Sequence, residues 1–463
     1  MIYKKMLVCI TALTVNFSSL CSYTPNTFIA FISGFNSPSY IAITPDNNYA
    51  YVTDDGSDSV LVIDTNPSSP TFNTLISAPN LLGVFNGPSG IAITPNGQYA
   101  YVANSASNNV LAIDTNPLST TFNSVIATLT GPFDSPNSIA MTPNGNYAYV
   151  TNAGNNSITV INLANNTILT TPNLNGILNS PFAIAITPNG NYAYITNLSG
   201  SVTVVDIRIN APVSAPGLAS VNSQPEGLAI TANGLVAYVS DGSGTDVTVL
   251  DINPASLTFN TVISTPNLAN TFDFPNGVAT TSDGNYAYVS NFIGATGNIS
   301  SVSVIDTNPA SPTYNSTLNT PGLVVASPPP FTRFISLAAT PNARFVYVVD
   351  GFNNTVDVIY TGIITPPLNF TSCTTQNTFL LQRDLINYLT WSAPTIGNPP
   401  VTYNIYRDPA LQTLVATIPA TSTLEYYDHN RSPYARDTYY IVSVDGSGNM
   451  SSPVSTAPTS LCI

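Results

Sequence analysis

The sequence predicts an all-β protein in which a seven-bladed β-propeller is followed by a smaller β-sandwich. The first observation is a segment repeated seven times, each copy marked by a tyrosine followed by valine or isoleucine, at Tyr51, Tyr101, Tyr149, Tyr194, Tyr238, Tyr288 and Tyr347. The second is their spacing of 44 to 59 residues, which suits four short strands with their turns rather than a helical solenoid. The third is the end of this period after residue 362, which indicates a domain boundary.

Each copy has the composition of an antiparallel sheet. In the fourth copy, residues 184–187 form an apolar run, and residues 188–191 (Pro-Asn-Gly-Asn) provide turn chemistry. Residues 192–196 and 202–205 predict the second and third strands, and a fourth strand follows in most copies. These runs are apolar on both faces, as expected when each small sheet lies between two others. Radial stacking of such sheets gives a propeller.

The chain ends predict how the ring closes. The seventh copy has strands at residues 335–340, 345–349 and 355–360, and then enters a proline-rich stretch without a fourth strand. Residues 27–32 precede Pro38 in the way that fourth strands precede the proline of the next copy. We therefore expect an N-terminal strand to complete the last blade.

The repeated Tyr-Val-Thr-Asn element resembles a known family. It stands at residues 149–152, and nearly so at residues 194–197, and the first is followed by Ser-Ile-Thr-Val-Ile-Asn at residues 157–162. Over residues 27–360 the chain resembles the YVTN family of bacterial and archaeal seven-bladed propellers. The resemblance implies an exported, often surface-associated protein, and by itself it does not imply catalysis.

Residues 363–463 resemble a fibronectin type III domain. Residues 367–370 match its first strand, and Trp391, the single tryptophan of the chain, matches its buried tryptophan. Residues 403–407 are similar to the third strand. The resemblance implies that Tyr440 is the tyrosine-corner residue.

The N-terminus is typical of a secretory signal. Lys4 and Lys5 precede an apolar stretch and a group of small residues, which predicts a signal peptide of residues 1–21 and a propeller domain of residues 22–362. A lipoprotein with Cys21 as its modified residue is the alternative, although Leu20 fits that processing poorly. We expect a bacterial protein that is secreted or held at the cell surface, without a membrane span, because no other segment approaches the roughly 18 to 20 apolar residues that one requires.

Composition excludes several classes of partner. The chain has 9 basic and 23 acidic residues, a formal net charge of −14, and no lysine beyond Lys5. Nucleic acid and anionic membrane surfaces both require basic clusters, so neither is an expected partner.

Catalytic and metal-binding groups are scarce. The one histidine, His429, lies in a polar loop of the sandwich, and the propeller offers no histidine base or ligand. We therefore predict no catalytic residue, no cofactor and no metal. Residues 54–58 and 241–246 have oxygen donors that could hold calcium, but turns between strands are the preferred interpretation. The Asp or Asn that ends each second strand is interpreted as a structural cap, at Asp54, Asn104, Asn152, Asn197, Asp241, Asn291 and Asp350.

Residues that break the repeat are the candidate binding residues. After the recurring proline most copies have a small or polar residue, but the fourth has Phe182 and the fifth Glu226. At the position before that proline, small residues give way to Gln224, Phe274 and Arg333 in the last three copies. The long loop 291–301 and the segment 326–331 add irregularity nearby. A binding surface on blades five to seven is the hypothesis, and loop drift is the alternative.

These observations favour a non-enzymatic, exported binding or adhesion protein that presents a propeller face to an extracellular protein or glycan. The alternative is a lactonase-like hydrolase on the same scaffold, in which Glu226 and Arg333 supply a carboxylate and a cation.

The cysteines give a test of the predicted compartment. Removal of the signal leaves Cys373 and Cys462, and an even pair in an exported chain predicts a disulfide, whereas two free thiols or half of a metal site are the alternatives. Alkylation and intact-mass measurement of protein from its native host should show a mature chain beginning near Ser22 with neither cysteine labelled. Labelling of both thiols without reduction would exclude the disulfide.

Overall fold

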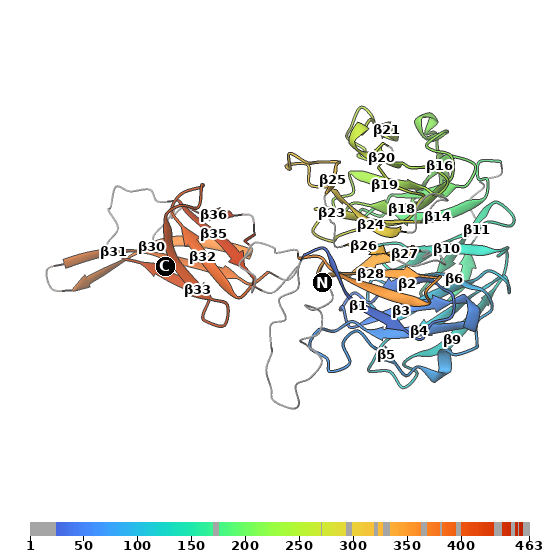
Figure 1. Cartoon of the computed structure of the whole chain (residues 1–463), viewed down its shortest axis with the longest axis horizontal. Helices are drawn as coiled ribbons and strands as arrows, with labels where there is room; N and C mark the ends of the chain where they lie inside the picture. The colour runs from blue at the N-terminus through green and yellow to red at the C-terminus, as the bar shows by residue number, and fades with distance from the viewer. Residues whose placement is uncertain are drawn as a thin grey trace. The chain divides into compact units, whose positions relative to one another are not determined.

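A computed structural model of the chain describes residues 25–169, 176–269, 271–292, 299–318, 323–326, 334–362, 368–379, 382–394, 400–429, 438–445, 450–451 and 453–456 (Figure 1). The chain forms two compact units, one of residues 26–361 and one that begins at residue 362. Residues 1–24, on which the predicted signal falls, lie outside the described part. Among the described residues, no helix has the length and hydropathy needed to cross a membrane.

The larger unit is a β-propeller, as predicted. Its described residues form seven sheets of four antiparallel strands each, and one sheet has an added strand. The first strands neighbour one another in a closed ring, with β2 beside both β6 and β27. They are β2 (Pro38–Ile43), β6 (Pro88–Ile93), β10 (Pro136–Met141), β14 (Pro181–Ile186), β18 (Pro225–Ile230), β22 (Pro275–Thr280) and β27 (Phe334–Ala339).

The other strands follow outward in the same order. The second strands are β3 (Tyr49–Asp54), β7 (Tyr99–Asn104), β11 (Tyr147–Asn152), β15 (Tyr192–Asn197), β19 (Val236–Asp241), β23 (Tyr286–Asn291) and β28 (Phe345–Asp350). The third strands are β4 (Ser59–Asp64), β8 (Asn109–Asp114), β12 (Ser157–Asn162), β16 (Ser201–Asp206), β20 (Val247–Asp251), β24 (Ile299–Asp306) and β29 (Thr355–Tyr360). The fourth strands are β5 (Leu75–Ile76), β9 (Ser124–Thr130), β13 (Thr167–Leu169), β17 (Ala211–Val213), β21 (Thr261–Ile263), β25 (Thr317–Leu318) and, in blade seven, β1 (Thr27–Ser33).

Blade seven confirms the predicted closure. Strand β1 pairs antiparallel with β29, with Thr27 opposite Tyr360 and Ser33 opposite Thr355. In blade six, β26 (Val324–Ala326) pairs with the start of β24. Short 3-10 turns complete the unit and are η1 (Asp55–Ser57), η2 (Pro79–Leu81), η3 (Pro216–Leu218) and η4 (Pro266–Leu268). The last three each place one buried leucine between blades.

The hydrophobic core lies between adjacent blades. One cluster joins Tyr194, Val202 and Val204 of blade four to Val239 and Leu250 of blade five, and all five are buried. Similar clusters join the other neighbours. Because both faces of each sheet are covered, the second strands are buried almost throughout, which explains their apolar composition.

A repeated hydrogen bond links each blade to the next. The tyrosine in the middle of each second strand is fully buried, and its hydroxyl donates to an asparagine that precedes the fourth strand of the next blade, at 2.5 to 2.7 Å. The pairs are Tyr51 with Asn123, Tyr101 with Asn166, Tyr149 with Asn210, Tyr194 with Asn260, Tyr238 with Asn315, Tyr288 with Asn26 and Tyr347 with Asn73. Each asparagine has a left-handed backbone, with φ between +49° and +59°, which asparagine tolerates better than most residues.

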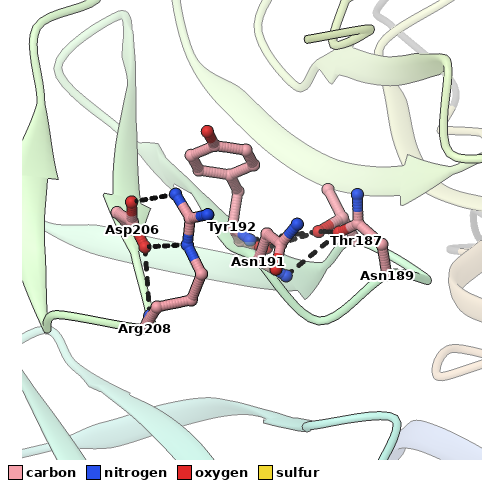
Figure 2. Close-up of polar contacts among 6 residues, drawn as sticks. All are labelled: Thr187, Asn189, Asn191, Tyr192, Asp206 and Arg208. Carbon is pink, nitrogen blue, oxygen red and sulfur yellow. Dashed lines mark hydrogen bonds and ion pairs between the residues drawn. The ribbon is translucent and has the colours of Figure 1, made fainter.

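The turns match their predicted chemistry. In blade four the Thr187 hydroxyl donates to Asn189 Oδ1 at 2.7 Å, and the Asn191 N–H donates to the same oxygen at 3.0 Å (Figure 2). In the loop between the third and fourth strands of this blade, Arg208 forms an ion pair with Asp206 at 2.6 Å and lies over the ring of Tyr192. The Arg208 guanidinium lowers the pKa of the Asp206 carboxyl.

The capping prediction for the second strands is confirmed at Asp54 and Asp241. Asp54 accepts a hydrogen bond from the Asn36 N–H at 2.7 Å, and Asp241 accepts one from the Gln224 N–H at 3.0 Å. Each carboxylate thereby fixes the loop that enters its blade. At Asn152 and Asn291, by contrast, Oδ1 has no partner among the described residues, and Nδ2 donates to hydroxyls of the third strand.

The smaller unit contains two sheets that share one core. Their strand orders are β30-β31-β34 and β33-β32-β35-β36. The strands are β30 (Leu368–Phe379), β31 (Gln382–Ser392), β32 (Thr402–Tyr406), β33 (Leu414–Pro419), β34 (Glu425–Asp428), β35 (Tyr439–Val444) and β36 (Val454–Thr456). Trp391 is buried as predicted. Its ring packs edge to face against the Tyr403 ring, with 5.5 Å between the ring centroids.

The position of the hydrogen-bonded tyrosine differs from the expectation. Tyr439, and not Tyr440, is fully buried, and its hydroxyl donates to Asp428 at 2.5 Å and accepts from Asn387 at 2.9 Å. Side chains alternate along β35, so a shift of one residue places Tyr440 on the other face. Asp428 also pairs with Arg407 at 2.6 Å.

Removal of one tyrosine hydroxyl should show how much the tyrosine–asparagine hydrogen bond between blades contributes to stability. In Tyr194→Phe, the buried Asn260 Oδ1 loses its donor, so we expect the free energy of unfolding to fall by about 1 to 3 kcal/mol. Tyr147→Phe removes an exposed hydroxyl from a comparable strand and should change stability by less than about 0.5 kcal/mol. Equal effects of the two variants in denaturant titrations would contradict this role.

A buried carboxyl in the closing blade should make stability depend on pH. Burial raises the pKa of Asp357 to about 7, against the lowering effect of the Thr355 hydroxyl, and the nearby Asp350 raises it further. The folded state therefore holds a proton that the unfolded chain releases above its ordinary pKa of 3.8. The stabilisation is complete below pH 4 and is lost as the pH rises through 7.

Asp357→Asn should remove this dependence. Relative to wild type, we expect the variant to gain roughly 2 to 4 kcal/mol of propeller stability between pH 4 and pH 8. Denaturant titrations at several pH values measure the gain, and Asp273→Asn, at an exposed acidic residue, is the control. A difference between wild type and Asp357→Asn that stays constant with pH would refute the assignment.

Candidate functional site at the mouth of the propeller

The irregular residues gather at one end of the ring, here called the mouth face. It is the end at which first strands begin and second strands finish, so it contains the loops that enter each blade and the loops between second and third strands. The Pro-Asn-Gly turns and the loops between third and fourth strands lie at the opposite face.

In the first three blades, the residue after the proline links the blade to its neighbour. Ser39 Oγ donates to the Pro88 carbonyl at 3.3 Å, and Ser89 Oγ donates to the Pro136 carbonyl at 2.9 Å. Asn137 Nδ2 likewise donates to a carbonyl of blade four, that of Phe182, at 3.2 Å. In blade three, Thr151 Oγ1 of the second strand also donates to the Phe182 carbonyl, at 3.0 Å.

In blades four and five, the second strand supplies this link without help from the residue after the proline. Thr196 Oγ1 donates to the Glu226 carbonyl at 3.2 Å, and Ser240 Oγ donates to the Asn276 carbonyl. The residue after the proline is therefore not needed for this hydrogen bond in blades four and five. In these two blades that residue is Phe182 and Glu226, respectively.

Phe182 and Glu226 come together around a cavity on the propeller axis. The cavity has a volume of ≈ 130 Å³ and is lined by residues from six blades, among them Tyr40, Ser138, Phe182, Glu226, Asn276 and Leu337. Gly227 and Gly277 also line it, and a Cβ at Gly227 would lie 2.2 Å from the Asn276 carbonyl oxygen. The first strands therefore approach closely here, and the cavity is narrow.

The Glu226 side chain is held in place by two neighbours. Gln224 Nε2 donates to Glu226 Oε1 at 3.0 Å. The carboxylate lies against Gly242, where a Cβ would come within 2.3 Å of Glu226 Cδ. In blades one to four and six the position of Gly242 has a side chain, namely Asp55, Ser105, Ala153, Leu198 and Phe292. Blade five thus combines a glutamate with the space that it needs.

Phe274 lies apart from the cavity lining, in the loop between blades five and six. Its N–H donates to the Gly244 carbonyl, and its carbonyl accepts from the Phe292 N–H, both at 3.0 Å. Its φ is +48°, a conformation in which other blades place serine or Gly87. For an aromatic residue this backbone is strained by roughly 1 to 3 kcal/mol.

Other predicted residues fall elsewhere. Arg333, most of the loop 291–301, nearly all of the segment 326–331, and Cys462 lie outside the described residues. The backbone of Cys373 lies in β30 opposite Tyr388. His429 is exposed in the smaller unit. Within the described ranges, no group of three His, Cys, Asp or Glu side chains could hold a metal ion.

Sequence reasoning missed Gly242 and identified Gln224 only as a departure from the small residues before the proline. Comparison of the position after each second-strand cap finds glycine in blades five and seven, and only blade five combines it with a glutamate after the proline.

Known proteins resemble parts of the chain. A family model described as lactonase, 7-bladed beta-propeller, matches residues 36–217, which comprise blades one to four. Among solved structures, 1263 chains match, so the likeness marks a widespread fold and not one function. One is hydrazine synthase of Kuenenia stuttgartiensis, with 20% identity, a TM-score of 0.54, and coverage of 72% of this chain and 97% of that chain. No curated protein sequence matches.

Proposed function

We propose that this chain is a non-enzymatic, exported binding protein whose mouth face receives a group that projects from an extracellular protein or glycan. The supporting observation is the size of the axial cavity. At ≈ 130 Å³ it is well below the roughly 300 to 1,000 Å³ of pockets that enclose a whole small molecule. A side chain or terminal group of a larger ligand suits this volume.

The smaller unit supports the same proposal as a spacer or second contact. Its three-plus-four strand arrangement and buried Trp391 support a fibronectin type III-like domain. Ser372 Oγ and Thr456 Oγ lie 3.1 Å apart, so the strand containing Cys373 adjoins the last described strand. This proximity supports, within the proposal, a disulfide between Cys373 and Cys462.

The second candidate is a lactonase-like hydrolase, favoured by the family match to blades one to four. That match ends before Glu226, and the described cavity lining contains this single carboxylate. General acid–base hydrolysis ordinarily uses a second titratable group within hydrogen-bond reach.

A comparison of the two faces tests the proposal. The protein is screened against purified extracellular proteins, a glycan array and a lactone panel. We expect a ligand whose binding falls at least tenfold in Phe182→Ala, because this change removes a wall of the cavity. Leu118→Ser and Leu257→Ser alter highly exposed residues of the opposite face and should bind normally. Lactone turnover without ligand binding would overturn the proposal in favour of the hydrolase.

A further inference from the structure

The outer edge of blade four has a groove that is separate from the axial cavity. Its volume is ≈ 540 Å³, and it is lined by Ile177, by residues 201–204 of β16 and by residues 212–215 and 219. The described lining residues are apolar or have a hydroxyl, and none of them is charged. The volume lies within the roughly 300 to 1,000 Å³ of pockets that enclose a ligand.

The groove lies where the fourth strand of blade four stops short. β17 pairs with the last three residues of β16, and no described strand pairs with the first three, Ser201, Val202 and Thr203, on that side. Pro216 follows soon after β17, and proline opposes a continued strand because it has no N–H and restricts the residue before it. The chain turns into η3 instead, and Leu218 packs between blades four and five.

Blades two and seven show which segment fits this position. β9 pairs with β8 over the full length of β8, so that Leu129 lies opposite Val110. β1 does the same along β29, where Ile32 lies opposite Val356. Val110 and Val356 are the second residues of their strands, as Val202 is of β16. The two covering strands, Ser-Val-Ile-Ala-Thr-Leu-Thr and Thr-Phe-Ile-Ala-Phe-Ile-Ser, are uncharged and contain no proline.

The backbone of Val202 is oriented to pair with such a segment. Ile207 N–H donates to the Asn191 carbonyl of β15 at 3.0 Å, and the hydrogen-bonding groups of successive residues alternate sides along an antiparallel strand. The N–H and C=O of Val202 therefore point away from β15, and neither has a hydrogen-bond partner among the described residues. Val221 N–H donates to the Gly200 carbonyl at 2.7 Å and so bounds the open edge. Buried backbone groups are nearly always paired, which favours a ligand with a backbone of its own.

We propose that the groove of blade four binds an extended, uncharged peptide segment of another protein, which adds antiparallel to the first half of β16. Main-chain hydrogen bonds to Val202 provide the pairing, and the apolar lining selects small and β-branched side chains. The orientation follows the fourth strands of blades two, four and seven, which are all antiparallel to their neighbours. This site does not depend on the binding function proposed for the mouth face.

Fluorescence anisotropy with the full mature protein tests the proposal. The probe is a labelled synthetic peptide of the β9 sequence, Ser-Val-Ile-Ala-Thr-Leu-Thr. We expect it to bind, and we expect an N-methyl group at the position of Leu129 to weaken binding at least tenfold, because this group removes the N–H that pairs with Val202. An N-methyl group at the position of Thr128, whose N–H points to the other side, is the control and should weaken binding less than threefold.

Matched variants locate the peptide. Ala219→Trp fills the groove and should weaken binding at least tenfold, whereas Ser220→Trp alters the next residue, which is exposed and outside the lining, and should change it less than threefold. Leu82 holds the corresponding position in blade one, beside a groove of ≈ 500 Å³ that includes Asp54. Leu82→Trp should leave binding unchanged. Thermal melts show whether each variant folds.

Four outcomes would overturn the inference. Failure of the unmodified peptide to bind would refute the site, and equal binding of the two N-methylated peptides would refute strand addition. Loss of binding in Leu82→Trp but not in Ala219→Trp would move the peptide to blade one. A dimer of the protein alone that Ala219→Trp dissociates, measured by light scattering, would assign the groove to a second copy of this chain instead of another protein.

Discussion

The propeller depends on one hydrogen bond made seven times, from a buried second-strand tyrosine to an asparagine of the next blade. Apolar burial presses neighbouring sheets together, but burial is non-directional and sets no angle between them. The tyrosine hydroxyl has to find an acceptor because an unpaired polar group in that core is costly. Its asparagine partner stands just before the fourth strand, so the bond fixes both the spacing of the blades and the start of that strand. Asn26 supplies the seventh acceptor, which ties the N-terminal strand into the ring.

This constraint separates structural positions from positions open to function. Residues that recur at the same position in every blade stabilise the ring. They are the second-strand tyrosine, the asparagine before the fourth strand, and the Asp or Asn that ends the second strand. The link at the mouth is less uniform. A residue after the proline makes it in blades one to three, and a second-strand hydroxyl makes it in blades three to five. Phe182 and Glu226 follow the proline in blades four and five, where a second-strand hydroxyl makes the link. These two positions can therefore hold other residues, which line the axial cavity without any change in the fold.

Much of this was accessible from the sequence, because a repeat shows which residues geometry requires. The strands, their turns and the closing strand β1 were predicted correctly. The tyrosine–asparagine bond was missed, although asparagine precedes the fourth strand in every copy, because its two residues are 61 to 77 positions apart within one circuit of blades one to six. The buried tyrosine of the smaller unit was predicted one residue away, at Tyr440 instead of Tyr439. When two tyrosines are adjacent in a strand, the sequence pattern does not say which one faces the core. The buried Asp357 was also missed, since its repeat position holds leucine, threonine or serine elsewhere.

A cavity of this size has a consequence for how any ligand is held. A volume of ≈ 130 Å³ is about that of four water molecules in the liquid, so the group inside it contributes only part of the contact area of a macromolecular ligand. The remaining affinity has to come from the loops around the mouth. Asp55, Asp58 and Asp273 are exposed there, and salt screens the field of such charges within about 8 to 10 Å. The cavity and the surrounding charges therefore have different roles: the cavity sets which group is accepted, and the charges influence how fast a charged ligand arrives. Selectivity in this arrangement resides in the few residues that depart from the repeat, and the regular blades serve to hold them around one axis.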